Sequence, residues 1–212
     1  MTTITGTNLD DVLATTAAGD VVYGLAGLDE ITIGHDDAEV WAGQGDDIVQ
    51  SNGATGATLY LGAGDDFAEV FGGSVAFGGA GDDTMTAAGD GAILRGDDGD
   101  DYLEAQAGGA DAYIKLNGGA DADTFFFAGG VTAETLIHVR DFDAAEGDAF
   151  QIGGLYDGAT NVGPSTFGDI VWTDRTDGGT GQDFVTAEWG DLTLRIDDHH
   201  AADLCAADFA FI

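Results

Sequence analysis

LGAGDDFAE, at residues 61–69, is one copy of a nine-residue unit that recurs from residue 6 to residue 126. Most copies place glycines at alternate positions, an aspartate at the sixth position and an apolar residue two places later. The other copies are GTNLDDVLA (6–14), GLAGLDEIT (24–32), AGQGDDIVQ (42–50), GGAGDDTMT (78–86), GDDGDDYLE (96–104) and GGADADTFF (118–126). A fixed short period is the sequence signature of a solenoid, in which each repeat stacks on the next.

The spacing between copies gives the size of one coil. Successive copies begin 17–19 residues apart from Gly6 to Gly96, and 22 residues separate Gly96 from Gly118. Degraded copies such as IGHDDAEVW (33–41) lie between them and keep the apolar position. Each nonapeptide predicts a tight turn and a short strand, because glycine permits the turn backbone and a short strand directs one side chain inward. We therefore predict an all-β, right-handed parallel β-roll with about 18 residues per coil over residues 1–127.

The apolar positions predict the core of this roll. On the strands that follow the intact turns, the inward residues are Leu13, Ile31, Val49, Ala68, Met85, Leu103 and Phe125. On the strands that follow the degraded turns, they are Val22, Val40, Leu59, Val75 and Leu94. A core this thin predicts that something other than apolar burial must supply much of the stability.

The charge of the chain narrows the choice of partners. Acidic residues number 40 against 5 basic ones, which gives a net charge of −35. This charge argues against nucleic acid and anionic membrane surfaces as partners, and no stretch is long and apolar enough to insert into a bilayer. Yet 44% of the residues are hydrophobic, too many for a disordered acidic tail. A multivalent cation that neutralises the carboxylates on folding would reconcile the two facts.

The sixth-position aspartates are the candidate metal ligands. Calcium takes six to eight oxygens from carboxylates and backbone carbonyls, and two turns stacked one coil apart could surround one ion. Up to about six ions could therefore lie along that edge of the roll. The acids one place earlier, such as Asp65 and Asp82, are expected to face solvent. The predicted ligands are Asp11, Asp29, Asp47, Asp66, Asp83, Asp101 and Asp123.

These repeats resemble the repeats-in-toxin (RTX, hemolysin-type calcium-binding) family of bacterial proteins exported by type I secretion. The resemblance covers residues 6–126, and VRDFDAAEGDAF (139–150) is similar to the segment that ends the β-roll in serralysin-type metalloproteases. It implies Ca²⁺ as the bound metal, held by the repeat aspartates and by backbone carbonyls of the turn glycines and their neighbours. The turn glycines are Gly24, Gly27, Gly43, Gly45, Gly62, Gly64, Gly79, Gly81, Gly96, Gly99 and Gly119.

The last stretch, GDLTLRIDDHHAADLCAADFAFI (190–212), resembles the common C-terminus of type I secretion substrates. The resemblance implies an uncleaved export signal, a type I exporter as a partner and an extracellular, bacterial location. The first twenty residues lack the basic cluster and apolar run of an ordinary signal peptide, which agrees with this expectation. The signal residues would be Asp208, Phe209, Phe211 and Ile212.

Residues 128–212 are predicted as a second unit, a C-terminal antiparallel β cap. Alternating apolar residues in DIVWTD (169–174), DFVTAEW (183–189) and DLTLRI (191–196) predict three antiparallel strands. Such a unit would cover the open end of the roll, whose unpaired edge otherwise invites aggregation.

Aromatic residues recur about once per coil after the degraded turns. We predict that they form one ladder, interrupted by Arg95. The ladder could be a stack packed by the C-terminal segment, or an exposed strip that contacts a sugar or a partner protein. The residues are Tyr23, Trp41, Tyr60, Phe77 and Tyr113.

The sequence carries neither the H-E-x-x-H zinc motif of metalloproteases nor the G-x-S-x-G motif of lipases. We expect a secreted, non-enzymatic protein that folds on binding extracellular calcium and has a structural, adhesive or matrix role. The alternative is a polysaccharide-acting enzyme or an accessory carbohydrate-binding module.

Overall fold

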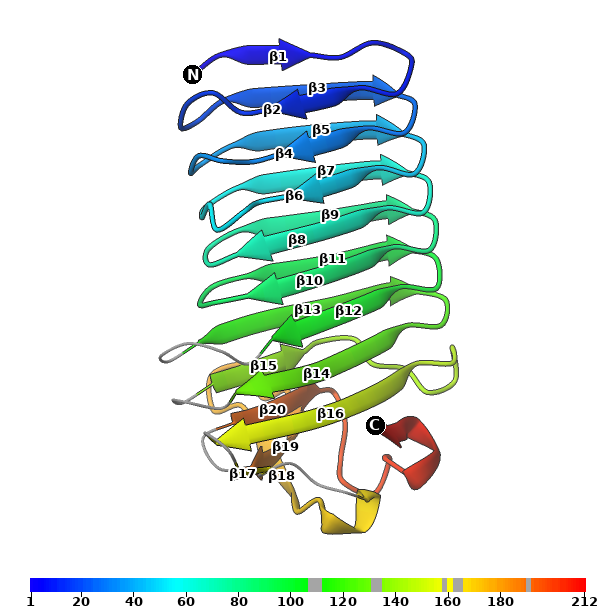
Figure 1. Ribbon diagram of the computed structural model, residues 1–212. Helices are drawn as coiled ribbons and strands as arrows, with labels where there is room; N and C mark the ends of the chain where they lie inside the picture. Colours follow the sequence, from blue (N-terminus) through cyan, green and yellow to red (C-terminus); the bar gives the residue numbers. More distant parts are fainter. Residues whose placement is uncertain (107–111, 131–134, 158–159, 162–165, 190–191) are drawn as a thin grey trace.

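The chain winds into a stack of coils, and each coil contributes one strand to each of two facing sheets (Figure 1). The structure is a computed structural model that describes residues 1–106, 112–130, 135–157, 160–161, 166–189 and 192–212. The coils run from the N-terminus at one end of the stack toward antiparallel strands at the other. The predicted all-β parallel solenoid with a C-terminal antiparallel part is confirmed.

The larger sheet has 11 strands. In spatial order they are β1 (Thr3–Thr5), β3 (Val21–Ala26), β5 (Glu39–Gln44), β7 (Thr58–Ala63), β9 (Val75–Ala80), β11 (Ile93–Asp98), β13 (Tyr113–Ala120), β15 (Thr135–Val139), β20 (Leu192–Asp197), β19 (Asp183–Trp189) and β18 (Trp172–Thr176).

The smaller sheet has 10 strands, of which nine lie in one row and the tenth, β21 (Phe209–Phe211), pairs with β16 beside that row. In spatial order the nine are β17 (Thr160–Asn161), β16 (Ala149–Asp157), β14 (Thr124–Gly130), β12 (Tyr102–Gln106), β10 (Thr84–Ala88), β8 (Phe67–Phe71), β6 (Ile48–Gln50), β4 (Glu30–Thr32) and β2 (Val12–Ala14). Two short 3-10 helices, Phe167–Asp169 and Ala206–Asp208, complete the described elements.

The core consists of the inward side chains of both sheets. Val40, Leu59 and Leu94 are fully buried, as predicted. The larger sheet buries a second row that includes Ala42 and Leu61, because most of its strands are six residues long rather than three. The prediction of one inward side chain per strand is therefore incomplete for this sheet.

One predicted core residue is wrong. Val75 is only partly buried, and Ala76 pairs with Leu59 and takes the inward place. The intact turns on either side of this coil begin 17 residues apart, at 61 and 78, and the same step of 17 residues leads from the inward Leu59 to Ala76. Val75 lies one residue before that position, and adjacent residues of a strand point to opposite faces of the sheet.

The predicted antiparallel strands are confirmed as β18, β19 and β20. They continue the larger sheet, because β20 pairs in parallel with β15 through partners such as Ile137 and Leu194. The predicted end of the roll at residue 127 falls inside β14, and both sheets run past it. The pairing of β20 satisfies backbone groups that β15 would otherwise leave unpaired.

The close approach of successive turns can be tested at Gly62. Its φ is 121°, and a methyl group there would overlap the Gly43 carbonyl oxygen of the preceding coil. We expect Gly62→Ala to lower the free energy of unfolding by about 2 kcal/mol or more, because left-handed strain and a backbone clash add.

The matched control is Gly53→Ala, at a φ of 83° with no atom within 4 Å of the added methyl group. This variant has the left-handed backbone strain without the backbone clash, so it should lower the free energy of unfolding by only about 1 kcal/mol. Denaturant unfolding in calcium-containing buffer measures both variants, and equal losses would contradict the close packing of the turns.

Candidate metal centre

The sixth-position aspartates form one buried row along the edge where the intact turns lead from the larger sheet to the smaller one. From Asp29 to Asp123 each is at most 2% exposed, and the partly exposed Asp11 begins the row. The stacking of coils places these carboxylates in successive turns, so like charges come close together without a basic side chain from the repeat between them.

One carboxylate oxygen of each aspartate links two coils. The Asp47 N–H donates to Asp66 Oδ1 at 2.6 Å, and the Asp66 N–H donates to Asp83 Oδ1 at 2.9 Å. The same bond recurs along the whole row from Asp11 to Asp148, at 2.6–3.0 Å. Asp148 thus ends the row, which repeat spacing could not reveal because this residue lies beyond the last nonapeptide.

The second oxygen of these carboxylates is left without a partner. Among the residues that the structure describes, five such Oδ2 atoms are buried and accept no hydrogen bond, in five successive coils. They belong to Asp29, Asp47, Asp66, Asp83 and Asp101. An unsatisfied buried polar group costs about 1–3 kcal/mol, and more when it is charged, so this row is unfavourable unless protons or a bound cation neutralise it.

Glycines keep the space beside these oxygens open. A methyl group at Gly78 would overlap Asp83 Oδ2 and the Gly96 carbonyl oxygen of the next coil. Gly96 stands in the same relation to Asp101 Oδ2 and the Gly118 carbonyl oxygen. A carboxylate oxygen and a carbonyl oxygen from the next coil therefore converge beside each of these glycines.

Burial without a counter-charge raises the pKa values of the row. Desolvation is the main cause, and repulsion from neighbouring aspartates adds to it. It raises the pKa of Asp47 to about 6, of Asp66, Asp83 and Asp101 to about 7, and of Asp123 to about 8. The metal-free fold therefore holds these groups partly protonated at neutral pH.

The donor set is one that a hard divalent cation takes. Carboxylate and carbonyl oxygens face a space closed to side chains, and the orphaned oxygens supply negative charge. No group of three His, Cys, Asp or Glu side chains converges in the described part of the chain. A cation in this row would therefore depend on backbone carbonyls as well as on the aspartates.

The acidic residues that directly precede the buried aspartates are exposed, as predicted, and they also accept hydrogen bonds from the next coil. The Asp65 N–H donates to Asp46 Oδ1, and the Asp82 N–H donates to Asp65 Oδ1, both at 3.0 Å. These side chains form a second, solvent-facing ladder between coils. The sequence did not predict this ladder, because the repeat spacing indicated only that these aspartates are exposed.

Asp11 differs from the rest of the predicted ligands. Its Oδ2 accepts hydrogen bonds from the backbone N–H and the hydroxyl of Thr7. The N-terminal turn lacks the alternating glycines of the other copies, so its own threonine satisfies the carboxylate.

The predicted turn glycines serve two purposes. Gly24 and Gly96 provide space, whereas the other nine have φ between 109° and 133°. Leu25 and Asp97 occupy equivalent left-handed positions, with φ of 90° and 79°. Leu25 is 43% exposed near the N-terminal end of the stack, where few atoms crowd it.

The aromatic ladder forms over four coils. Trp41 stacks on Tyr60 with ring centroids 3.9 Å apart, and Tyr60 stacks on Phe77 at 5.1 Å. Tyr23 pairs with Trp41 in register and extends the row. The ring faces of the three stacked residues therefore lie against one another, but Tyr23 and Trp41 are 37% and 40% exposed, so the C-terminal segment does not cover this part of the ladder.

Tyr113 was wrongly placed in this ladder. The row continues from Phe77 to Arg95 and then to Asn117. The coil between the turns at 96 and 118 is 22 residues long, and its four extra residues move Tyr113 out of register.

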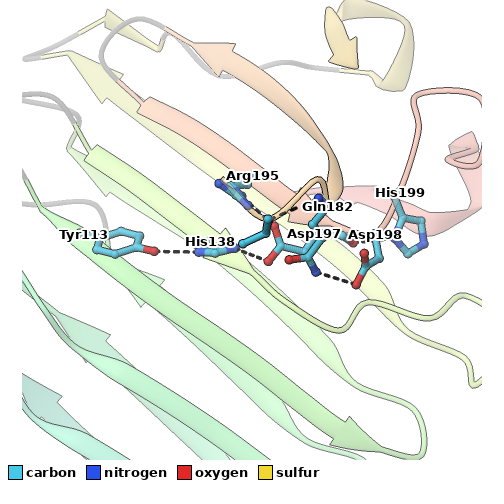
Figure 2. Close-up of polar contacts among 8 residues, drawn as sticks. Tyr113, His138, Gln182, Arg195, Asp197, Asp198 and His199 are labelled. Carbon is cyan, nitrogen blue, oxygen red and sulfur yellow. Dashed lines mark hydrogen bonds and ion pairs between the residues drawn. The ribbon is translucent and has the colours of Figure 1, made fainter. Parts of the chain in front are cut away.

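A buried polar network joins the roll to the antiparallel strands, as Figure 2 shows. Because a carboxylate only accepts, His138 Nε2–H donates to Asp197 Oδ2 at 2.7 Å and the Tyr113 hydroxyl donates to Nδ1 at 2.8 Å. Arg195 donates to the other oxygen of Asp197 at 2.7 Å. Burial raises the pKa of Tyr113 and lowers that of His138, so the tyrosine is not activated. Sequence reasoning missed the network because its members come from three separated strands.

Comparisons with known proteins give distant likenesses in structure alone. No family model and no curated protein matches the sequence. The extracellular lipase LipA from Serratia marcescens is similar in structure with a TM-score of 0.36 at 15% identity. The alignment covers 99% of this chain and 40% of the lipase, so the chain spans less than half the length of that protein.

The raised pKa values predict how the metal-free fold responds to pH. Each carboxylate takes up a proton on folding, because its pKa rises from 3.8 to about 7 for Asp66, Asp83 and Asp101. The folded state then binds more protons than the unfolded state, so stability falls as pH rises between these two values. Metal-stripped protein should therefore lose its folded fraction progressively as pH rises from about 5 to about 7, and circular dichroism measures this loss.

Asp83→Asn should flatten this dependence, because the amide cannot titrate. Asp82→Asn, which changes the exposed neighbour, should leave the slope unchanged. A metal-free fold that becomes more stable as pH rises through this window would contradict the buried row.

Proposed function

We propose that this chain is a secreted calcium-binding protein of the RTX type, which folds when it meets extracellular calcium. The observation that carries the proposal is the row of five buried, unpartnered carboxylate oxygens in successive coils. Calcium suits these sites because it accepts a variable number of carboxylate and carbonyl oxygens in flexible geometry. Magnesium demands near-ideal octahedral geometry and releases its waters reluctantly, so it should substitute poorly.

Calcium would act as the trigger for folding. Without it, the net charge of −35 and the buried carboxylates oppose compaction, and the 36 glycines add backbone entropy to the unfolded state. The ions would offset these costs, and binding free energy would become folding free energy. Inside the cell, where free calcium is scarce, the chain would stay unfolded enough to pass an exporter.

The C-terminal residues support a role in export before folding. In the folded chain Phe209 is 7% exposed, and its ring lies 4.9 Å from that of Phe150. Asp208 accepts a hydrogen bond from the Cys205 N–H and is also buried, whereas Ile212 is 75% exposed. Two of the four signal residues are thus buried in the folded chain, so an exporter would read them on the unfolded chain, and folding outside would cover them.

The proposed role is structural or adhesive rather than catalytic. The Tyr–His–Asp network is the arrangement in the described residues that most resembles catalytic machinery. Its tyrosine has a raised pKa, and Arg195 compensates its aspartate. The network therefore suits a brace between β13, β15 and β20 better than a nucleophile with its base.

Calcium titration followed by circular dichroism tests the proposal. Metal-stripped protein at neutral pH should show mostly coil, and calcium should induce strand signal steeply, whereas magnesium should not. Asp66→Asn should raise the midpoint calcium concentration by at least about twofold, because it removes an orphaned carboxylate oxygen whose ion stabilises only the folded state.

Asp65→Asn is the matched control, since it removes the same charge from the exposed neighbour and should leave the midpoint nearly unchanged. A chain that is fully structured in chelator at neutral pH would overturn the proposal, as would equal effects of the two variants.

A further inference from the structure

Most of the positive charge of this acidic chain lies on one surface. The chain has five basic residues against 40 acidic ones, and four of the five lie on or directly after neighbouring strands of the larger sheet, whereas the fifth, Arg175, lies on its edge strand β18. They occupy β11, β13, the position directly after β15, and β20. These residues are Arg95, Lys115, Arg140 and Arg195.

The strand register brings these side chains together. Arg95 pairs with Asn117, and the Arg140 N–H donates to the Leu116 carbonyl oxygen at 3.2 Å. Lys115 and Asn117 point outward, because they flank the buried Leu116 on β13. Neighbouring strands lie about 4.8 Å apart, so cations on β11, β13 and β15 can reach one ligand.

A hollow lies among these side chains. Its volume is about 220 Å³, and we call it the basic groove. Its lining includes Phe77, Ile93, Arg95, Lys115, Asn117 and Arg140. Three cations, one amide and several apolar residues thus line a space large enough for a small ring.

The cations of the groove are poorly compensated. Arg95 lies 3.8 Å from Asp97, and both side chains are more than a third exposed, so this ion pair contributes little. Within the described residues, Lys115 and Arg140 form no ion pair. Lys115 Nζ lies over the Tyr113 ring, 4.9 Å from its centroid, a contact that does not neutralise its charge. In a chain with 40 carboxylates, neither cation is therefore neutralised by an ion pair.

The nearest carboxylates are already engaged elsewhere. Asp197 accepts from both His138 and Arg195, as Figure 2 shows. Asp141 accepts from the Asn117 side chain and from the Gly118 and Gly119 N–H groups. The protein's own acids therefore do not occupy the groove, and its positive charge is directed to an external anion.

The apolar lining restricts which anion fits. Arg95 lies over the Phe77 ring, with its guanidinium carbon 5.5 Å from the ring centroid, and thereby ends the aromatic ladder. Ile93 lies between Val75 and Lys115 in register. A ligand that fills the groove must combine a compact, partly apolar ring with a negative group.

We propose that the basic groove binds an acidic sugar unit of an anionic glycan. The carboxylate or sulfate of the sugar lies between Lys115 and Arg140, and its ring lies against Ile93 and Phe77. Charge-assisted hydrogen bonds from lysine and arginine supply the affinity, and the Asn117 amide supplies a hydrogen bond to a hydroxyl group.

Nucleic acid fits these observations less well. Duplex DNA carries one negative charge per about 1.7 Å, a higher charge density than that of a glycan with one acidic group per sugar, so the rest of this acidic chain would repel DNA more strongly. Single strands bind by stacking bases on free aromatic faces. The faces of Tyr60 and Phe77 are instead covered by neighbouring rings and by Arg95.

Calorimetric titration in millimolar calcium tests the proposal with four probes. They are a galacturonate tetrasaccharide, a chondroitin sulfate tetrasaccharide, cellotetraose and a short single-stranded DNA. We expect at least one acidic tetrasaccharide to bind at least about tenfold more tightly than cellotetraose, because each charge-assisted contact is worth about that factor. The tighter acidic probe identifies the anionic group, and either preference supports the proposal.

Two variants locate the site. Lys115→Gln and Arg140→Gln should each weaken binding of the tighter tetrasaccharide about tenfold. The control Arg175→Gln removes the same charge on β18, at the far edge of the sheet, and should bind as the wild type does. Circular dichroism should show calcium-induced folding in all three variants, which separates this test from that of the proposed function.

Three results would overturn the proposal. The folded wild type could fail to bind either acidic tetrasaccharide, the control could lose as much affinity as the groove variants, or the DNA could bind more tightly than both saccharides.

Discussion

The structure depends on the burial of like-charged carboxylates in a single row. Stacking repeats of about 18 residues places Asp47, Asp66 and Asp83 one coil apart, each almost fully buried. Such a row is unfavourable by itself, because desolvation and mutual repulsion both oppose ionisation. Whatever stabilises this fold must therefore supply positive charge at this edge, where the repeat offers no basic side chain.

The two oxygens of each carboxylate have different roles: one accepts a backbone hydrogen bond, and the other is the proposed ligand of a cation. Oδ1 accepts the N–H of the aspartate one coil earlier and so fixes the spacing of the turns. Oδ2 remains free beside a glycine and a carbonyl oxygen of the next coil. This division accounts for the glycines at Gly78 and Gly96, which keep space open and do not need a left-handed backbone.

The repeat made most of the fold predictable. A fixed period specified the coils and the inward residues such as Val40 and Leu59, and the same spacing identified the buried aspartates. The prediction failed where the period changed. In the 17-residue coil Ala76 takes the inward place predicted for Val75, and the 22-residue coil moved Tyr113 out of the ladder.

Other features could not be predicted because no local pattern encodes them. The Tyr113–His138–Asp197 network and the basic groove join strands that are far apart in the sequence. The basic residues that line the groove attract notice only when the strand register brings them together. A sequence period predicts contacts between residues that lie one coil apart. Contacts between irregular segments depend on how those segments pair in the folded chain, which no period indicates.

The positive groove and the negative row lie on different parts of the same coils. Arg95 on β11 belongs to the outer face of the larger sheet, whereas Asp101 lies in the turn that follows that strand. A cation-dependent fold would thus assemble the groove only when the coils are stacked, since its residues come from β11, β13 and the end of β15. Binding at the groove would in this way depend on the metal without contact between the two.

The most direct measurement is a crystal structure grown in millimolar calcium, with anomalous scattering used to locate the ions. The account predicts calcium density beside the Oδ2 atoms of Asp29, Asp47, Asp66, Asp83 and Asp101, between successive turns. A well-ordered roll without cations at these oxygens, or with water or a basic side chain bound to them instead, would contradict it.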